Sequence, residues 1–182
     1  MKDVIKELVG WIVSILLIVA VSYLIVTFVG QRTQVSGSSM ETTLSDGDHL
    51  IVDKISYRFR EPQRYEIVVF PYRYEKNTYY IKRIIGLPGD TVACKGSGEP
   101  ITVNGKPIDE SAYLKSGVNP SDSPFSVTVT DGNVFVLGDN RSNSRDSRYH
   151  LDDGNNGLVP YDDIQGVALF RFWPFTRIGI LN

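Results

Sequence analysis

The sequence has a single cysteine, Cys94, so the chain cannot form an internal disulfide bond. No histidine or second cysteine lies near Cys94 in the sequence, and the usual ligand spacing of a zinc site is therefore missing. We interpret Cys94 as a small packing residue, and we expect the protein to need no metal or cofactor.

An excess of positive charge is also missing, because 19 Lys and Arg residues face 21 Asp and Glu residues, for a net charge of -2. Nucleic acids are bound mainly through clustered Lys and Arg, so we expect no nucleic-acid partner. Convincing amphipathic helical patterns are absent from residues 32–182, which disfavours an α/β sheet with crossover helices. The 182 residues have room for one membrane segment and one domain of ordinary size.

The longest apolar run covers residues 8–31 and contains no charged side chain. A helix of ~20 such residues spans the hydrocarbon core of a bilayer. A cleavable signal peptide is the alternative, because Ala20-Val21-Ser22 has a small-x-small pattern, but the run continues to Val29 and exceeds the usual ~7–15 apolar residues. We expect residues 1–31 to form a tail and an uncleaved transmembrane anchor.

Lys2 and Lys6 precede this run and favour an amino terminus on the inner side of the membrane. Residues 32–182 would then form an extracytoplasmic domain of a single-pass protein in the cell membrane. Their short β-branched and aromatic runs, separated by turn residues, predict an all-β domain. The predicted strands cover residues 49–56, 65–70, 79–85, 91–94, 101–103, 126–130, 133–137 and 166–172. Loops rich in Gly, Ser and Pro predict a small excursion from the main sheet around residues 91–131.

Residues 36–40 form a glycine-containing turn shortly after the apolar run. Such a turn can expose a serine side chain and direct backbone N–H groups outward, which suits a nucleophile and its oxyanion hole. A Ser/Gly linker is the simpler interpretation, and the segment alone favours it.

The strand predicted at residues 79–85 has Tyr80, Lys82 and Ile84 on one face. Burial disfavours a lysine ammonium, and about 4 kcal/mol of destabilisation would lower its pKa from ~10.4 to near 7 or 8. A neutral lysine can take the proton of a serine hydroxyl. The alternative is an edge-strand lysine that limits aggregation, and periodicity alone leaves both interpretations open.

Residues 137–148 gather polar side chains after an apolar strand and form either a hydrogen-bond scaffold or a solvated turn.

The order of an α/β-hydrolase triad is also present, with Ser39, then Asp139 or Asp146, then His150. The nucleophile elbow of that fold needs glycine at the position of Glu41, however. Residues 152–157 resemble a fragment of a calcium loop without its spacing or terminal glutamate, so a polar turn is expected there.

Several segments resemble the ordered sequence boxes of type I signal peptidases. They are residues 37–44, 46–48, 66–70, 80–90 and 138–148. They occur in the family's order, and the likeness covers nearly the whole chain. The resemblance implies a membrane-anchored serine protease whose antiparallel sheets form a partly open, barrel-like catalytic domain. It also implies removal of signal peptides from exported preproteins after small-x-small sites, with preprotein signal peptides and membrane lipids as partners.

The resemblance assigns Ser39 as the nucleophile and Lys82 as the general base of an acyl-enzyme mechanism. Ser144 matches a loop serine whose hydroxyl would orient the lysine amine. Gly37 stands where some members place a hydroxyl that helps to bind the oxyanion. The oxyanion hole would therefore use the Ser39 N–H, with Ser38 or a water.

The resemblance also assigns supporting residues that hold the loop after the apolar strand. Asp146 and Arg148 match an ion pair of the family, with Arg83 as a further partner, and Asp139 and Asn140 belong to the same sequence box.

Substrate would bind as an added strand between the segment before the nucleophile and the strand that carries the base. Ile81 matches a position in the shallow pocket for the residue before the cut, which excludes large side chains by overpacking. The expected substrate-binding residues are Gln34, Val35, Ser36, Tyr80 and Ile81.

The chain departs from the family pattern at Thr42, where proline is usual, and at Tyr65, where glycine is usual. Threonine at position 42 does not fix φ as proline does, which predicts a looser turn after the nucleophile.

A catalytically weak or silent relative that assists assembly of surface proteins is the alternative function. A self-cleaving Ser-Lys regulator is a third possible function, although such proteins generally carry a DNA-binding module.

Residues 170–175 are aromatic and form either a core strand or a surface that rests on the bilayer.

Overall fold

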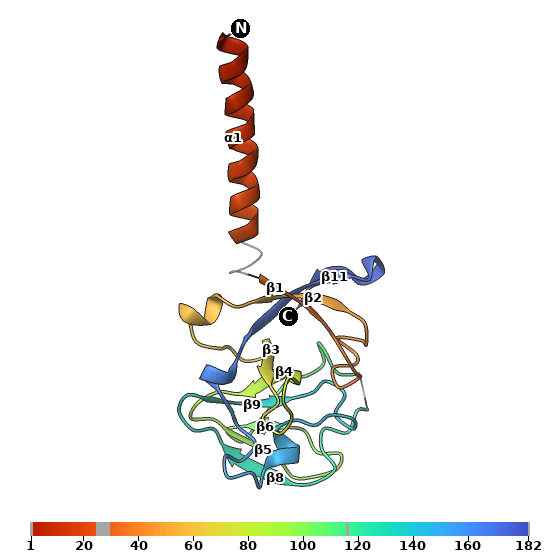
Figure 1. The fold of residues 1–182 in the computed structure, drawn as a ribbon. Coiled ribbons are helices and arrows are strands. Elements are labelled where there is room, and N and C mark those ends of the chain that lie inside the picture. The colour runs from red at the N-terminus through yellow and green to blue at the C-terminus, as the bar shows by residue number, and fades with distance from the viewer. Residues whose placement is uncertain (1, 25–29, 116, 182) are drawn as a thin grey trace.

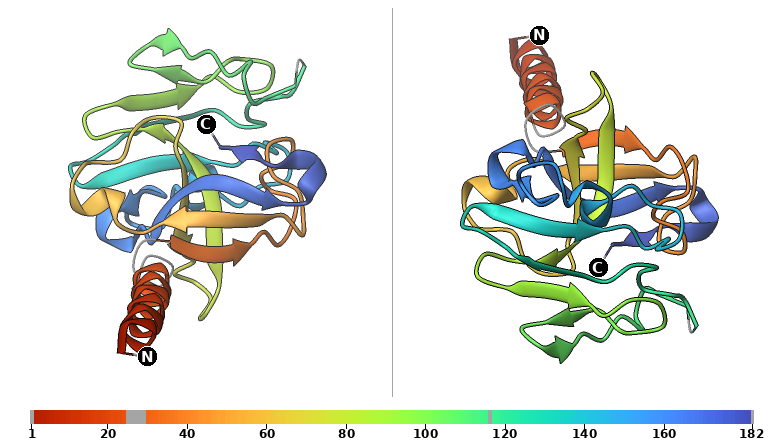
Figure 2. Two further views of the ribbon diagram at one scale, coloured as in Figure 1. Left: turned by 90° about the horizontal axis from the view of Figure 1, so that it is seen from above. Right: turned by 90° about the horizontal axis from the view of Figure 1, so that it is seen from below.

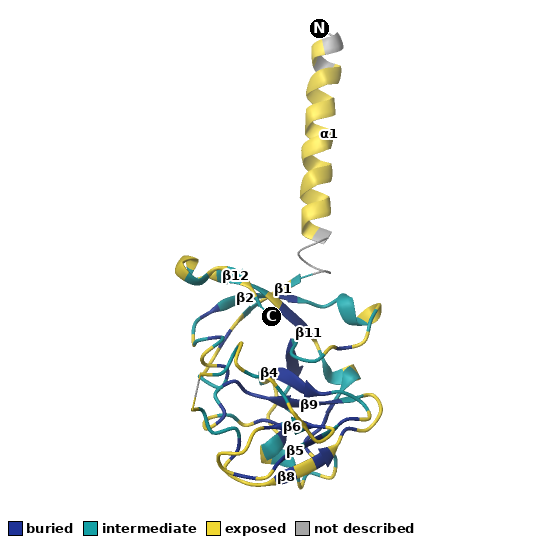
Figure 3. Cartoon of the chain, turned by 180° about the vertical axis from the view of Figure 1, so that it is seen from behind, coloured by how far each residue is buried: buried dark blue, intermediate teal, exposed yellow. Residues whose placement is uncertain are grey.

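The computed structural model describes residues 2–24, 30–115 and 117–181. Helix α1, Lys2–Leu24, extends away from a β domain (Figure 1). Its segment Lys6–Tyr23 has a mean hydropathy of 1.8, is not buried against the rest of the protein, and is the one candidate membrane span in the described part of the chain. Figure 3 shows the described side chains of the helix exposed, whereas buried residues concentrate in the strands. So much exposed apolar surface is stable in lipid rather than in water.

The end of the expected anchor differs from the observed helix. Residues 25–29 lie outside the described residues, and Gly30 and Gln31 belong to strand β1, Gly30–Gln34. The boundary expected between residues 31 and 32 therefore lies within a strand. The apolar character of the run does not reveal this change, because only the pairing of β1 with β2 identifies it.

The main sheet has eight strands in the order β1-β2-β11-β3-β4-β9-β10, with β12 paired to β11. Their bounds are β1 Gly30–Gln34, β2 His49–Asp53, β3 Ile67–Pro71, β4 Tyr79–Gly86, β9 Asn133–Leu137, β10 Val159–Pro160, β11 Gly166–Trp173 and β12 Gly179–Ile180. Their pairings are antiparallel. The all-β, antiparallel fold class is thus confirmed. Strands β1, β2 and β11 lie at the α1 end of the domain, and β3, β4 and β9 lie farther from it (Figure 1).

The sheet bends at the start of β11. This strand pairs with β2 over most of its length but with β3 only at Gly166 and Val167. A Cβ atom at Gly166 would lie 2.3 Å from the Asp53 carbonyl oxygen, so glycine permits the close approach of the two strands. The two halves enclose a shared apolar core. Its buried residues are Val35, Met40, Leu44, Leu50, Ile67 and Ala168.

A second sheet of four strands has the order β7-β6-β5-β8. Its strands are β5 Thr91–Cys94, β6 Thr102–Val103, β7 Lys106–Pro107 and β8 Phe125–Thr128. It lies at the end of the domain away from α1 (Figure 1) and projects to one side (Figure 2). Phe125 and Val127 of this sheet pack in one cluster with Phe135 and Leu137 of the main sheet. Cys94 is buried in the same cluster, as a small packing residue.

Most predicted strands match the observed ones within a few residues, and two differences have local causes. The strand predicted at residues 49–56 ends at Asp53, because the Asp53 carboxylate accepts hydrogen bonds from the Ile55 and Ser56 N–H groups. Strands β7, β10 and β12 have two residues each, too few to show a periodicity. Short 3₁₀ helices complete the fold: η2 Ser56–Arg58, η3 Ser147–His150, η4 Tyr161–Asp163 and η5 Phe175–Arg177.

Candidate active site

Strand β4 positions Lys82 at the end of a free strand edge. β4 pairs with β3 from Tyr79 to Arg83, but its pairing with β9 begins only at Arg83, opposite Leu137. Beyond Leu137 the chain leaves the sheet, so residues 79–82 keep one unpaired edge. The Lys82 side chain itself is only 2% exposed.

The turn that carries Ser39 is anchored in the apolar core on both sides. Val35 precedes it and Met40 follows it, and both side chains are buried. Gly37 has a φ of +90°, which glycine adopts without strain, and its N–H donates to the Asp46 carboxylate at 2.8 Å. The turn therefore presents Ser39 in one orientation.

The turn brings Ser39 to Lys82. Lys82 Nζ donates to Ser39 Oγ at 2.7 Å and to the Ile81 carbonyl oxygen at 2.9 Å. Burial lowers the Lys82 pKa to about 8, although the carboxylates of Asp146 and Asp139 oppose the shift. A large fraction of this amine is therefore neutral near pH 8 and able to accept the hydroxyl proton.

The loop after β9 binds the backbone of the nucleophile turn. The Asn140 N–H donates to the Ser39 carbonyl oxygen at 3.0 Å, and Asn140 Nδ2 donates to the Ser38 carbonyl oxygen at 3.1 Å. Asn143 Nδ2 donates to Ser38 Oγ at 2.9 Å. Sequence reasoning assigned Asn140 only through its sequence box and did not identify Asn143, because exposed asparagines of this kind are common in loops.

Gly138 lies where this loop passes closest to the nucleophile. A Cβ atom there would lie 2.2 Å from Ser144 Oγ and 2.5 Å from the Ser39 carbonyl oxygen, so glycine is required. Ser144 Oγ is buried and has no hydrogen-bond partner among the described residues. The expected contact between this hydroxyl and the Lys82 amine is thus not formed here. The hydroxyl packs beside Gly138, and the amine donates to Ser39 and Ile81 instead.

The structure brings Asp146 and Arg148 together at the base of the loop. Arg148 Nη2 lies 2.8 Å from Asp146 Oδ2, and the same carboxylate oxygen accepts the Gly138 N–H at 3.0 Å. Arg148 also donates to the carbonyl oxygens of Pro120 and Arg141. This ion pair therefore fixes the segment that contacts the nucleophile.

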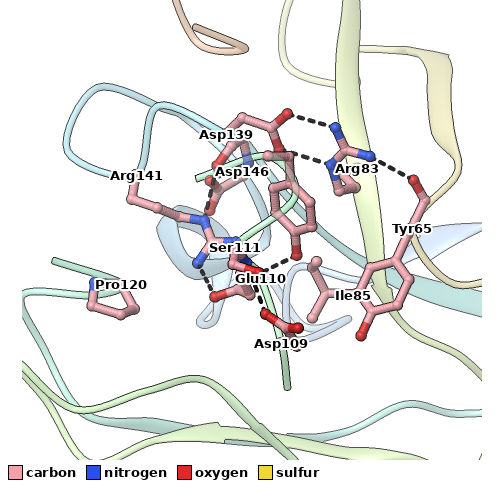
Figure 4. Close-up of polar contacts among 12 residues, drawn as sticks. Tyr65, Arg83, Ile85, Asp109, Glu110, Ser111, Pro120, Asp139, Arg141 and Asp146 are labelled. Carbon is pink, nitrogen blue, oxygen red and sulfur yellow. Dashed lines mark hydrogen bonds and ion pairs between the residues drawn. The ribbon is translucent and has the colours of Figure 1, made fainter. Parts of the chain in front are cut away.

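Arg83 and Asp139 form a second ion pair, which is fully buried (Figure 4). Two hydrogen bonds of 3.0 and 2.8 Å join the guanidinium to the carboxylate, and Arg83 Nη1 donates to the Tyr65 carbonyl oxygen at 2.8 Å. Arg83 was expected beside Asp146 and Arg148, but its described salt bridge is with Asp139. The φ of Tyr65 is +73°, a left-handed conformation that explains why glycine is usual at this position.

Arg141 and Glu110 form a third pair that sequence reasoning missed (Figure 4). Arg141 Nη1 donates to Glu110 at 3.0 Å, and its Nε donates to the Gly138 carbonyl oxygen at 3.0 Å. Glu110 belongs to the excursion between the strands of the second sheet, and no local pattern relates it to the loop after β9.

The turn after the nucleophile, where the family pattern has proline, is joined to neighbouring segments by two threonine hydroxyls. The Thr42 hydroxyl donates to the Tyr113 carbonyl oxygen at 2.8 Å. The Thr43 hydroxyl hydrogen-bonds to the Asp139 carboxylate. The looser turn expected from the missing proline stays a prediction.

The expected substrate-binding residues line one groove together with the nucleophile and the lysine. Its walls include Gln34, Val35, Ser36, Tyr80, Ile81, Ser39 and Lys82. The unpaired edge of β4 forms part of the wall, so an extended peptide has backbone groups available for pairing.

The alternative triad is not assembled. His150 stacks on Tyr74, with ring centroids 4.6 Å apart, and burial lowers the His150 pKa. The carboxylates of Asp139 and Asp146 are engaged by arginines, and the hydroxyl of Ser39 contacts Lys82.

The segment at residues 152–157 forms a polar turn. The Asp153 carboxylate accepts the N–H groups of Asn155 and Gly157. Within the described ranges, no group of three or more His, Cys, Asp and Glu side chains is arranged to hold a metal ion.

Comparison with known proteins identifies the family of this chain. The family model described as signal peptidase, peptidase S26, matches residues 8–173. A probable signal peptidase I-2 from Synechocystis is 45% identical over 161 residues, which cover 86% of this chain and 69% of that protein. Signal peptidase IB from Staphylococcus aureus is 35% identical over 188 residues, covering 94% of this chain and 93% of that protein. A solved signal peptidase I from Enterococcus faecalis is 32% identical, covers 59% of this chain and 97% of that one, and has a TM-score of 0.46. The chain therefore belongs to the signal peptidase family, peptidase S26.

Proposed function

We propose that this peptidase removes amino-terminal signal peptides from exported preproteins after small-x-small sites, with Ser39 as nucleophile and Lys82 as general base. The observation that carries this proposal is the 2.7 Å contact between Lys82 Nζ and Ser39 Oγ, made by a lysine that burial keeps about half neutral near pH 8. Family membership supports the reaction, and the groove beside the dyad supports the substrate class.

In the proposed mechanism, neutral Lys82 takes the hydroxyl proton as Ser39 Oγ attacks the scissile carbonyl carbon. The protonated lysine then gives this proton to the leaving amine, and an ester links the signal peptide to Ser39. Lys82 next takes a proton from a water molecule, which attacks the ester and releases the signal peptide.

The oxyanion formed in each step needs hydrogen-bond donors near Ser39 Oγ. Among the described residues, no acceptor is assigned to the Ser39 N–H, whereas the Gly37 N–H is committed to Asp46. Ser38 Oγ accepts a hydrogen bond from Asn143, so its own proton is left to donate. We assign the oxyanion hole to the Ser39 N–H and the Ser38 hydroxyl.

The substrate pairs as an extended strand with the free edge of β4 and the segment at residues 34–36. Its residue before the cut faces Ile81, which packs on the buried cluster that contains Val35 and Met40. This cluster leaves little depth, so alanine or glycine fits and larger side chains overpack the site.

Helix α1 serves as a single membrane anchor for the domain at residues 30–182, which lies on the extracytoplasmic side. The helix is apolar and unburied, and the domain turns β1, β2 and β11 toward it (Figure 1). Signal peptides also end at the membrane surface, so this placement brings the groove to its substrates.

The test is cleavage of a preprotein with an Ala-x-Ala site by the full chain in detergent. Ser39→Ala and Lys82→Ala, each shown to be folded, should lose at least about a thousandfold in rate. Wild-type cleavage by either variant would refute the dyad. His150→Ala is the matched control and should retain activity, since a loss there would favour the triad. An inactive wild-type chain would favour the assembly-factor alternative.

A further inference from the structure

The groove beside the dyad is lined unevenly with charge. Of its described lining residues, Lys82 and Arg145 are the basic ones, and none is Asp or Glu. Burial keeps Lys82 partly neutral, so Arg145 supplies the permanent charge of the groove.

Arg145 differs from its neighbours in the same loop, because among the described residues no carboxylate forms a salt bridge with it. Arg141 is paired with Glu110 and Arg148 with Asp146, whereas no ion pair is assigned to Arg145 within the described parts of the chain. Its side chain is exposed.

The neighbours of the Arg145 guanidinium are tyrosines. The guanidinium carbon lies 5.6 Å from the centre of the Tyr149 ring, and the side chain also interacts with the hydroxyl of Tyr80. Aromatic neighbours restrict the guanidinium without neutralising it, so it remains available to a carboxylate on a ligand.

The place of Arg145 relative to the cut follows from the elements around Ser39. Residues 34–36 and 79–81 hold the part of the substrate before the cut. The loop that contains Asn143 and Arg145 reaches the nucleophile turn through the Asn143–Ser38 hydrogen bond. The substrate chain at the cut therefore passes beside this loop.

Strand alternation then selects one substrate residue. Side chains of an extended peptide point alternately to opposite faces, so a residue before the cut that faces Ile81 is followed by one that faces Tyr80. Tyr80 and Arg145 both line the groove, and their side chains interact with each other. The first residue after the cut is thus directed at the Arg145 guanidinium.

We propose that Arg145 determines specificity at the first residue after the cut, favouring Asp or Glu there and disfavouring Lys or Arg. This inference rests on the proposed function. An exposed ion pair is worth little, so we expect about a threefold gain in kcat/KM for Glu over Gln and a similar loss for Lys. Both effects should shrink as salt increases, because solvent-exposed charges are screened.

The experiment uses the full chain in uncharged detergent and peptides that differ only in the first residue after the cut, which is Glu, Gln or Lys. The wild type should prefer Glu to Lys by about tenfold at low salt. Arg145→Gln should bring this ratio close to one, and Arg145→Glu should reverse it. Arg58→Gln removes an exposed arginine outside the groove and should leave the ratio unchanged.

A Glu preference that persists in Arg145→Gln would overturn the proposal. So would an Arg145-dependent preference at the residue two before the cut instead of the residue after it. The Gln peptide distinguishes failure of the proposed function from failure of the proposed role of Arg145. If the wild type does not cleave the Gln peptide, the proposed function fails. If it cleaves all three peptides at one rate, only the role of Arg145 is refuted.

Discussion

The ε-amine of Lys82 lies 2.7 Å from the hydroxyl of Ser39, although the two residues are 43 positions apart in the chain. Lys82 belongs to β4, and Ser39 belongs to a turn anchored by Val35 and Met40 in the core between the two halves of the sheet. The core therefore holds the Ser39 turn in place, and burial of the amine lowers the pKa of Lys82. Reactivity should follow the protonation of one lysine.

The pH dependence of cleavage tests that relation. Because burial lowers the Lys82 pKa to about 8, kcat/KM should rise about tenfold per pH unit below this value and level off above it. The measurement is a pH profile with a peptide that has no titrating side chain. His150→Ala should leave the acidic limb in place. A limb near pH 6.5 that disappears in this variant would identify a histidine base.

The same buried lysine should reduce stability at neutral pH. The folded state releases the lysine proton near pH 8, whereas the unfolded state holds it to about 10.5, so the folded state is penalised by roughly 3 kcal/mol below pH 8. Stability should rise with pH between these values, as the penalty disappears. Lys82→Met removes the penalty and should unfold at higher denaturant concentration at about pH 7, while losing activity.

Denaturant titrations of Lys82→Met and the wild type at about pH 7 and about pH 10.5 make the comparison. The advantage of the methionine variant should be largest at the lower pH and should shrink at the higher one, where the wild-type amine is neutral in the folded state and half neutral in the unfolded state. An advantage of the same size at both pH values would show that packing, not charge, causes it.

Gly138 should be more sensitive to substitution than its small side chain suggests. In Gly138→Ala the new methyl group would collide with the Ser39 carbonyl oxygen, which belongs to the backbone and cannot rotate away. We expect kcat to fall by at least about a hundredfold, since a displaced nucleophile no longer meets the lysine or the substrate. Gly179→Ala is the matched control, because a methyl group at Gly179 would meet no atom within 4 Å and the φ there is ordinary.

Much of the fold could be predicted from sequence because its strands carry local signals. β5 and β9 are β-branched runs bounded by turn residues, and their predicted bounds match the observed ones. The period of two also predicts that Tyr80, Lys82 and Ile84 share a face. Strand β1 escaped prediction because its sequence, GQRTQ, has no apolar alternation, and only its pairing with β2 reveals it.

The supporting contacts of the site could not be predicted in the same way. Asp139 finds Arg83 across 56 positions, and Glu110 finds Arg141 across 31, so neither pair leaves a local pattern. The direction of the Ser144 hydroxyl is a rotamer choice set by packing against Gly138, and sequence boxes carry no information about it.

The buried ion pair of Arg83 and Asp139 should matter far more for stability than an exposed one. Asp139→Asn removes the negative charge that faces the Arg83 guanidinium, which has no exposed surface. We expect the free energy of unfolding to fall by about 3–5 kcal/mol. Asp163→Asn breaks the half-exposed pair with Arg73 and should cost less than about 1 kcal/mol. Equal losses in the two variants, measured by denaturant titration, would contradict the burial argument.

The aromatic carboxy-terminal segment should contact the bilayer rather than complete the core. Trp173 is 44% exposed, Phe175 is 73% exposed and Ile180 of β12 is 76% exposed, and β11 and β12 lie at the α1 end of the domain (Figure 3). For a fragment of residues 30–182, Trp173→Ala should lower liposome binding by roughly tenfold, because one large interfacial side chain is removed. Tyr149→Ala, which removes an exposed aromatic on η3, should bind like the parent fragment. Equal binding of all three proteins would mean that the membrane is contacted through α1 and not through this segment.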